Sequence, residues 1–215
     1  LFHRPIQIVQ NATDGALVDL VECAIGKGLS QMTEPARKAY PVILAALENP
    51  DKERVVVVCH SQGTIIMANV LRALKSHEFK SKLYADASHA PTEQHCTEPA
   101  ALEDDSLLSK LEIYAFANCA TTLRKVENQD YPYIESFANE HDIVARLGCI
   151  CPDADELGID IDGPIFERKG MWGHLLNIHH LFGMRDHLEG GKANPYTHKD
   201  GLTPRLYKYY QGKKP

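Results

Sequence analysis

Residues 54–74 read RVVVVCHSQGTIIMANVLRAL, and this stretch decides the fold. The apolar β-branched run at residues 55–58 predicts a buried strand, and the largely apolar segment after Gly63 predicts a helix. The pentapeptide Cys59-His60-Ser61-Gln62-Gly63 between them predicts a tight turn that carries a serine. This is the context of the G-x-S-x-G elbow, whose strained turn leaves the serine hydroxyl exposed above the sheet. Cys59 stands where the motif has its first glycine, whereas the second glycine is kept.

The rest of the chain alternates predicted strands with predicted helices. Strands are expected at residues 5–10, 111–118, 133–139 and 164–167, and helices at residues 16–27 and 34–47. Such alternation predicts βαβ units and an α/β fold, with a mostly parallel sheet of about five to six strands flanked by helices on both faces. The chain has 215 residues, which suits a single domain over residues 1–215. Functional residues are expected beyond the carboxyl ends of the strands, where parallel sheets bind ligands.

Two segments interrupt this alternation. Residues 76–110 are rich in Ala, Glu, Asp and His and contain two prolines. A connection of this length in a compact domain is either a functional lid or a passive surface insertion, and the composition does not separate the two. Residues 188–215 contain several Gly and Pro residues and predict an irregular C-terminal tail, packed by Leu206, Tyr207 and Tyr210.

Charge and composition argue against some classes of partner. The formal net charge of −6 at pH 7 disfavours nucleic acid, because phosphate binding needs concentrated Lys and Arg. No stretch has the length and apolarity of a transmembrane helix, and the first residues do not read as a signal peptide. Of the six cysteines, Cys59 and Cys119 fall in or beside predicted buried strands, where thiols act as small hydrophobic groups. We therefore expect a cytoplasmic protein with reduced thiols; secretion stays open if an upstream signal has been removed.

An active serine needs two partners that can be sought in the sequence. A serine hydroxyl is a weak nucleophile at neutral pH, so it requires a histidine base and a carboxylate that orients the imidazole. In folds with the serine elbow, the acid and then the histidine follow later strands. Asp142 lies just after the strand expected at residues 133–139, with Glu140 as a local rival and Glu135 as a weaker one. Given Ser61 as the nucleophile, we predict Asp142 as the acid.

The histidine is expected in the last connection from a strand to a helix, Gly170-Met171-Trp172-Gly173-His174. Glycines beside His174 suit a loop that must present an imidazole to a serine on another strand. His179 and His180 stand in an apolar segment, so structural roles are expected for both. His174 is therefore the predicted base.

An oxyanion hole requires two backbone N–H donors aimed at the developing negative charge. Gln62 follows the serine and supplies the first donor. The second is expected from Asn11 or Ala12, which follow the strand predicted at residues 5–10. Chemistry of this kind proceeds without a cofactor.

Other kinds of site receive less support. His89, His95 and Cys96 form a loose cluster without the spacing of a known metal site. The acidic residues at 153–162 lack the alternating ligands, central Gly and terminal Glu of an EF-hand, so a solvated acidic loop is expected. We predict neither a metal nor a cofactor.

Five stretches carry a family resemblance: residues 11–15 (NATDG), 19–23 (DLVEC), 59–63 (CHSQG), 137–148 (FANEHDIVARLG) and 173–177 (GHLLN). Together they resemble the serine esterases and lipase-like proteins of the α/β-hydrolase superfamily, most closely an uncharacterised fungal branch. The resemblance covers most of residues 6–182 and implies Ser61 as nucleophile, Asp142 as acid and His174 as base. The chain departs from this family in its small predicted sheet, which lacks the early antiparallel strands of larger members, so a reduced version of the α/β-hydrolase fold is expected.

These inferences predict a serine hydrolase that cleaves a carboxylic ester or related acyl bond, in a small-molecule or lipid substrate, through an acyl-enzyme. Two alternatives stay open because fold does not determine function. One is lactone opening, acyl transfer or cyclisation in small-molecule biosynthesis. The other is a non-catalytic binding or scaffold protein, against which a complete Ser-Asp-His set in the required order argues.

Overall fold

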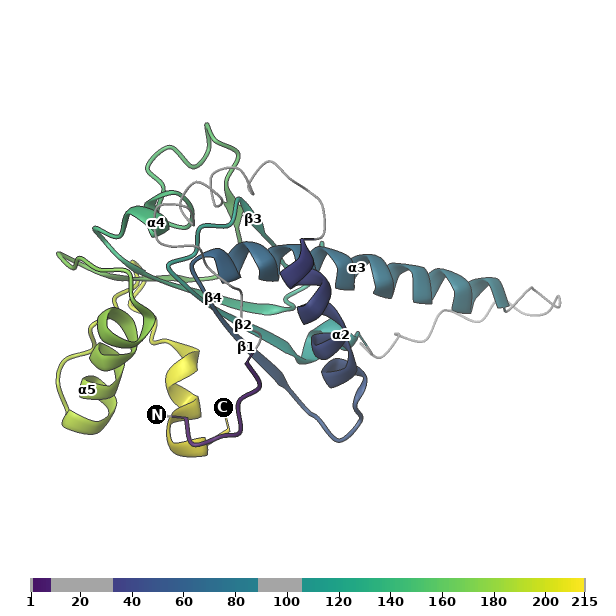
Figure 1. Ribbon diagram of the computed structural model, residues 1–215, viewed down its shortest axis with the longest axis horizontal. Helices are drawn as coiled ribbons and strands as arrows, with labels where there is room; N and C mark the ends of the chain where they lie inside the picture. Colours follow the sequence, from purple (N-terminus) through teal and green to yellow (C-terminus); the bar gives the residue numbers. More distant parts are fainter. Residues whose placement is uncertain (1, 9–32, 89–105, 215) are drawn as a thin grey trace.

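The computed structural model describes residues 2–8, 33–88 and 106–214 (Figure 1). Its helices are α2 (Glu34–Glu48), α3 (Gln62–Ser88), α4 (Ile143–Arg146), the π-helix η2 (Leu176–Leu181), α5 (Phe182–Gly190), and the 3-10 helices η1 (Leu107–Lys110) and η3 (Arg205–Gly212). Its strands are β1 (Val55–His60), β2 (Leu111–Phe116), β3 (Thr122–Leu123), β4 (Tyr133–Asn139), β5 (Asp160–Ile161) and β6 (Ile165–Arg168). The strand, turn and helix expected within residues 54–74 are present as β1, Ser61 and α3.

A parallel sheet lies at the centre of the described fold. Its four strands have the order β1-β2-β4-β6, and all three pairings are parallel. β3 and β5 form a separate two-stranded parallel pair. The α/β class with a mostly parallel sheet is therefore confirmed. The main sheet has four strands among the described residues, whereas about five to six were expected.

The strand expected at residues 5–10 is not formed by its described part. Residues 5–8 have no regular secondary structure, and Ile6 and Ile8 are exposed. The neighbouring Arg4 donates hydrogen bonds from Nη2 to the backbone oxygens of Gly212 and Lys213, at 2.6 and 2.9 Å. This segment is thus tied to the C-terminal end instead of pairing with the sheet. Residues 9–10 and the helix expected at 16–27 lie outside the described residues.

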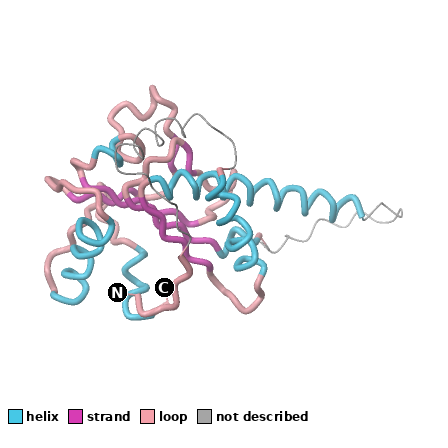
Figure 2. The backbone as a smooth tube through the Cα atoms, viewed as in Figure 1, coloured by secondary structure: helices cyan, strands magenta, loops and turns pink. Residues whose placement is uncertain are grey.

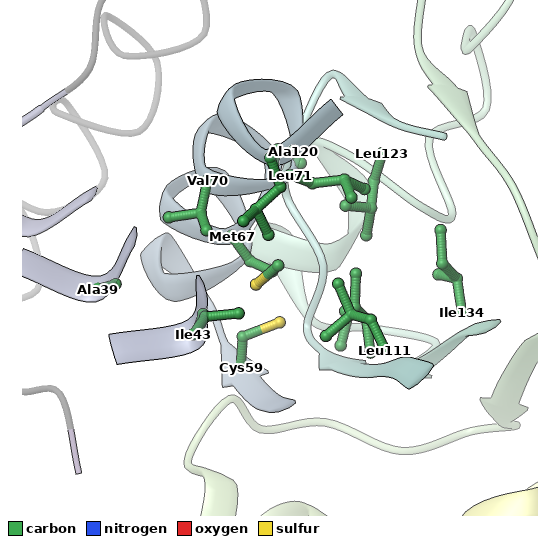
Figure 3. Close-up of a cluster of buried hydrophobic side chains, with 14 of the residues drawn as sticks. Ala39, Ile43, Cys59, Met67, Val70, Leu71, Leu111, Ala120, Leu123 and Ile134 are labelled. Atoms are coloured by element: carbon green, nitrogen blue, oxygen red, sulfur yellow. The ribbon is translucent and has the colours of Figure 1, made fainter. Parts of the chain in front are cut away.

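Helices cover the sheet on both faces (Figures 1 and 2). Successive side chains of a strand point to opposite faces, so β2 contributes to two separate cores. Leu111, Ile113 and Ala115 pack on the face covered by α2 and α3. Tyr114 and Phe116 pack on the other face, against side chains of α5 and η3. Figure 3 shows the first core, in which Ala39 and Ile43 of α2 and Met67, Val70 and Leu71 of α3 meet Cys59 and Leu111 of the sheet.

Residues 76–110 differ from the irregular connection that their composition suggested. α3 continues to Ser88, and η1 begins at Leu107. The sequence has neither Gly nor Pro between Gly63 and Pro91, so nothing in it interrupts the helix in this interval. In Figure 1 the end of α3 projects away from the sheet. A lid role for this segment stays a prediction, because residues 89–105 lie outside the described residues. Within the described part of the chain, no helix combines the length and apolarity needed to cross a bilayer.

The C-terminal segment is more regular than expected. α5 extends to Gly190, Thr197 forms an antiparallel bridge with Glu167, and η3 follows. Leu206 and Tyr207 are buried as expected, but Tyr209, and not Tyr210, is the third buried side chain of η3. The tail is therefore a packed layer of the second core.

A buried carboxylate holds η3 against the amino-terminal end of the sheet. Glu112 in β2 is 3% exposed and accepts hydrogen bonds at both oxygens. Its Oε1 lies 3.0 Å from Nη1 of Arg54 and 2.6 Å from Nη2 of Arg205. Its Oε2 accepts from the hydroxyls of Tyr114 and Tyr209, each at 2.7 Å. Four charged or polar partners therefore offset the cost of burying this carboxylate.

Glu135 in β4 makes a second buried anchor for η3. Its Oε1 accepts from the Tyr133 hydroxyl at 2.7 Å and from the backbone N–H of Arg205 at 2.6 Å, and its Oε2 accepts from the N–H of Leu206 at 3.2 Å. Burial raises the pKa of Glu135, while these hydrogen bonds oppose the rise. The first N–H groups of η3 are thereby satisfied by a side chain of the sheet.

We predict that Glu112→Ala lowers the free energy of unfolding by about 3–5 kcal/mol, because it leaves two buried tyrosine hydroxyls and two partly exposed arginines without their acceptor. The matched control is Glu53→Ala, which removes an exposed ion pair to Lys214 at 2.8 Å and should cause no measurable change. Urea unfolding followed by circular dichroism measures both. Equal effects of the two substitutions would show that the Glu112 cluster does not hold the C-terminal layer.

Candidate active site

Ser61 occupies a strained turn between β1 and α3. Its φ of 55° lies in the left-handed region, which residues with a Cβ seldom adopt. The turn is held by hydrogen bonds on both sides of the serine. The N–H of Ser61 donates to the Phe116 oxygen at 3.0 Å, and its carbonyl accepts from the N–H and hydroxyl of Thr64 at 2.8 and 2.7 Å. This is the local geometry that the elbow motif predicts.

Cys59 fits the position where the motif has glycine. Its side chain is buried in the first core, and a Cβ placed on Gly63 would lie 3.8 Å from the Cβ of Cys59, an ordinary contact. Burial raises the pKa of the Cys59 thiol to about 12, so the group stays protonated at neutral pH. Cys59 therefore acts as a small hydrophobic side chain, as expected from the sequence.

Asp142 is buried at the start of α4. The side chain is 2% exposed, and Oδ1 accepts from the N–H of Val144 at 3.0 Å, which caps the helix. Oδ2 lies 2.9 Å from Nδ1 of His174. A carboxylate only accepts hydrogen bonds, so Nδ1 of His174 carries the proton and donates it to Asp142.

His174 connects the acid to the serine. It lies in the loop between β6 and η2, and its Nε2 is 2.9 Å from Oγ of Ser61. With the proton on Nδ1, the lone pair of Nε2 accepts from the serine hydroxyl. The His174 side chain is 33% exposed, so a substrate can reach it from solvent. Ser61, His174 and Asp142 thus form one hydrogen-bonded chain, although their catalytic role stays a prediction.

The backbone around His174 is held by side chains from three elements. Asn139 at the end of β4 donates to the Gly173 oxygen at 2.7 Å. His60 at the end of β1 donates from Nε2 to the His174 oxygen at 2.7 Å. His179 in η2 accepts at Nδ1 from the N–H of Leu175 at 2.9 Å. Two consecutive peptide groups, 173–174 and 174–175, are therefore fixed, the second at both its oxygen and its N–H.

The rings of His179 and His180 are packed against neighbouring residues, in line with the structural roles expected from the sequence. The ring of His179 fills the space beside Gly173, where an added Cβ would lie 2.4 Å from the ring. His180 is fully buried, and its Nδ1 lies 2.6 Å from the hydroxyl of Tyr196. Burial lowers the pKa of His180 to about 3, so this imidazole is neutral at physiological pH.

The rival carboxylates have other partners. Glu140 accepts from the N–H of Gly170 at 2.6 Å and pairs with Lys169 at 3.7 Å. Glu135 anchors η3 at the far end of β4, as described above. Of the three carboxylates considered from the sequence, Asp142 is the one that the structure brings to His174.

The remaining predicted site residues are described only in part. Gln62 is the first residue of α3, where the positive end of the helix dipole lies beside Ser61. Asn11 and Ala12, and the His89, His95 and Cys96 cluster, lie outside the described residues. Among the described residues, no three His, Cys, Asp or Glu side chains are grouped as metal ligands. In the acidic segment, Asp160 and Asp162 pair with Arg124, at 2.9 and 3.9 Å.

Sequence reasoning missed the supporting roles of His60 and Asn139. Both residues end a strand, so both lie at the edge of the sheet where Asp142 and His174 gather. Their partners are backbone oxygens of a loop more than 30 residues away along the chain. The position of each residue at the end of a strand could have marked it as part of the site. The carbonyl to which each one bonds could not have been found from the sequence.

Comparison with known proteins returns no relative. No family model, no curated protein and no solved structure matches the chain.

We predict that Gly173→Ala destabilises the loop that carries His174. Gly173 has a φ of 106°, and its new Cβ would displace the His179 ring. Gly170→Ala is the matched control, because Gly170 also has a positive φ, of 68°, but nothing within 4 Å of its added Cβ. Gly173→Ala should lower the free energy of unfolding by about 1–3 kcal/mol more than the control does. Equal losses in urea unfolding would contradict the close packing of His179 on Gly173.

Proposed function

We propose that this protein is a serine hydrolase that cleaves a carboxylic ester or a related acyl bond. The observation that carries the proposal is the chain from Ser61 Oγ through His174 to Asp142, with 2.9 Å at each hydrogen bond. Each of the three side chains has the partner that its role requires, and the serine lies in a strained turn at the start of a helix.

The reaction follows from these positions. Ser61 Oγ attacks the carbonyl carbon of the substrate while Nε2 of His174 takes the hydroxyl proton. Asp142 stabilises the imidazolium that forms. The negative oxygen is held by the N–H of Gln62 and by a second N–H, which we assign to Asn11 or Ala12. Collapse of this intermediate expels the alcohol, which takes the proton from His174, and leaves the acyl group on Ser61. Water then loses a proton to His174 and attacks the acyl-enzyme, and His174 returns that proton to Ser61 Oγ as the acid is released.

Exposed apolar side chains beside His174 favour an apolar group on the substrate. Trp172 is 68% exposed, Leu175 55% and Ile178 56%, and all three flank His174 in sequence. Exposed apolar side chains close to reactive groups are typical of residues that contact a ligand. We therefore propose an acyl or alcohol portion of hydrocarbon character, in a small molecule or a lipid. Lactone opening and acyl transfer use the same acyl-enzyme, and a panel of esters and lactones separates them.

We predict that a fluorophosphonate probe labels the purified protein covalently at Ser61, because the probe reacts with a serine that a histidine activates. Ser61→Ala should abolish labelling. Ser76→Ala is the control, since the Ser76 hydroxyl bonds to the Arg72 oxygen on the surface of α3 and should have no effect. Folded wild-type protein that does not label would favour the binding or scaffold alternative.

A second prediction separates Asp142 from its neighbour Glu140. Asp142→Asn should lower kcat for a p-nitrophenyl ester by about 10⁴-fold, because the amide no longer holds the Nδ1–H tautomer or stabilises the imidazolium. Glu140→Gln changes a carboxylate two residues away that bonds to Gly170, and most of the activity should be kept. Comparable losses from both substitutions would contradict the assignment of Asp142.

A further inference from the structure

We propose that His60 is a positioning residue that holds the backbone of His174 against the serine. The inference rests on the proposed function, because it assigns His60 a part in the reaction of Ser61. It concerns a side chain outside the Ser61, His174 and Asp142 chain. Its contact is the hydrogen bond from Nε2 to the His174 oxygen, at 2.7 Å.

The need for such a contact follows from the order of the strands. Ser61 follows β1 and His174 follows β6, which are the two edges of the four-stranded sheet. Three inter-strand steps separate them, or roughly 14 Å at about 4.8 Å per step. The loop that carries His174 must therefore cross the end of the sheet to bring the imidazole within 2.9 Å of Ser61.

His60 ties the two ends of this span together. It is adjacent to Ser61 in the chain, so its bond to the His174 oxygen links the strand of the nucleophile directly to the residue of the base. The two rings also lie side by side, with centroids 4.6 Å apart and planes at 37°. Asn139 fixes the preceding carbonyl from β4, but only His60 among the three loop contacts comes from β1.

The direction of the hydrogen bond fixes the tautomer of His60. A carbonyl oxygen only accepts, so Nε2 of His60 carries the proton, and the nitrogen that faces His174 cannot act as a base. Burial lowers the pKa of His60, which favours the neutral ring. A neutral ring at this distance does not oppose the positive charge that forms on His174 during the reaction.

Two explanations of the contact make different predictions. If His60 only fills space, a phenylalanine would serve, because its ring occupies a similar volume. If the hydrogen bond positions His174, a glutamine would serve better, because its amide N–H can donate at a similar reach. The pair His60→Phe and His60→Gln therefore distinguishes packing from positioning.

The experiment measures kcat and KM of these variants with a p-nitrophenyl ester. His60→Phe should lower kcat by about 10- to 100-fold with little change in KM, because a displaced base is less able to take the proton. His60→Gln should recover most of the loss. His187→Phe is the matched control, because His187 in α5 also donates to a backbone oxygen, that of Lys192 at 2.6 Å, and should leave kcat unchanged. A wild-type kcat in His60→Phe, or equal losses in His60→Phe and His60→Gln, would overturn the proposal.

A readout that needs no turnover keeps this test separate from that of the hydrolase proposal. The proton on Nδ1 of His174, bonded to Asp142, should give a downfield proton resonance in the NMR spectrum of the wild-type protein. That resonance should broaden or disappear in His60→Phe and persist in His60→Gln and His187→Phe. Its persistence in His60→Phe would overturn the positioning role even if the wild-type protein proves inactive. Thermal unfolding of each variant checks that the fold is intact.

Discussion

The imidazole of His174 reaches Ser61 from the opposite edge of the sheet, and the other features of the site serve that reach. β6 places the loop, Gly173 turns it at a φ of 106°, and Asp142 holds Nδ1 from the end of β4. The imidazole is thereby held between an acceptor on one side and a hydroxyl donor on the other. A 1 Å error in its position would break both hydrogen bonds, which explains why two consecutive peptide groups of the loop are anchored through three of their polar atoms.

The two ends of the parallel sheet carry different kinds of polar cluster. At the carboxyl ends lie Ser61, Asp142 and His174, in a strained turn and a partly exposed loop. Toward the amino ends lie Glu112 and Glu135, each buried and bonded to residues of η3. Glu112 and Glu135 thereby hold the C-terminal layer against the second core. Stability and the proposed chemistry are therefore supported at opposite ends of the same strands, so substitutions at one end need not disturb the other.

Much of this arrangement was predictable because it depends on short-range patterns. The β-branched run at residues 55–58, the serine turn and the apolar segment after it predict β1, the elbow and the start of α3. Asp142 and His174 were found from chain order and from their positions just after strands. The end of α3 was missed because acidic and polar composition suggested a loop, although helix breakers are absent there. The bonds of Glu112 to Arg205 and of His60 to the His174 oxygen join residues 93 and 114 positions apart, and no local pattern reveals such partners.

The claim at the centre of this interpretation is that Ser61 becomes acylated during turnover. Mass spectrometry of protein quenched in acid while it hydrolyses a p-nitrophenyl ester measures this directly. We expect the mass of the acyl group on the peptide that contains Ser61, and no acyl group in Ser61→Ala. Hydrolysis that continues in Ser61→Ala, or an acyl group found on a different residue, would contradict the claim.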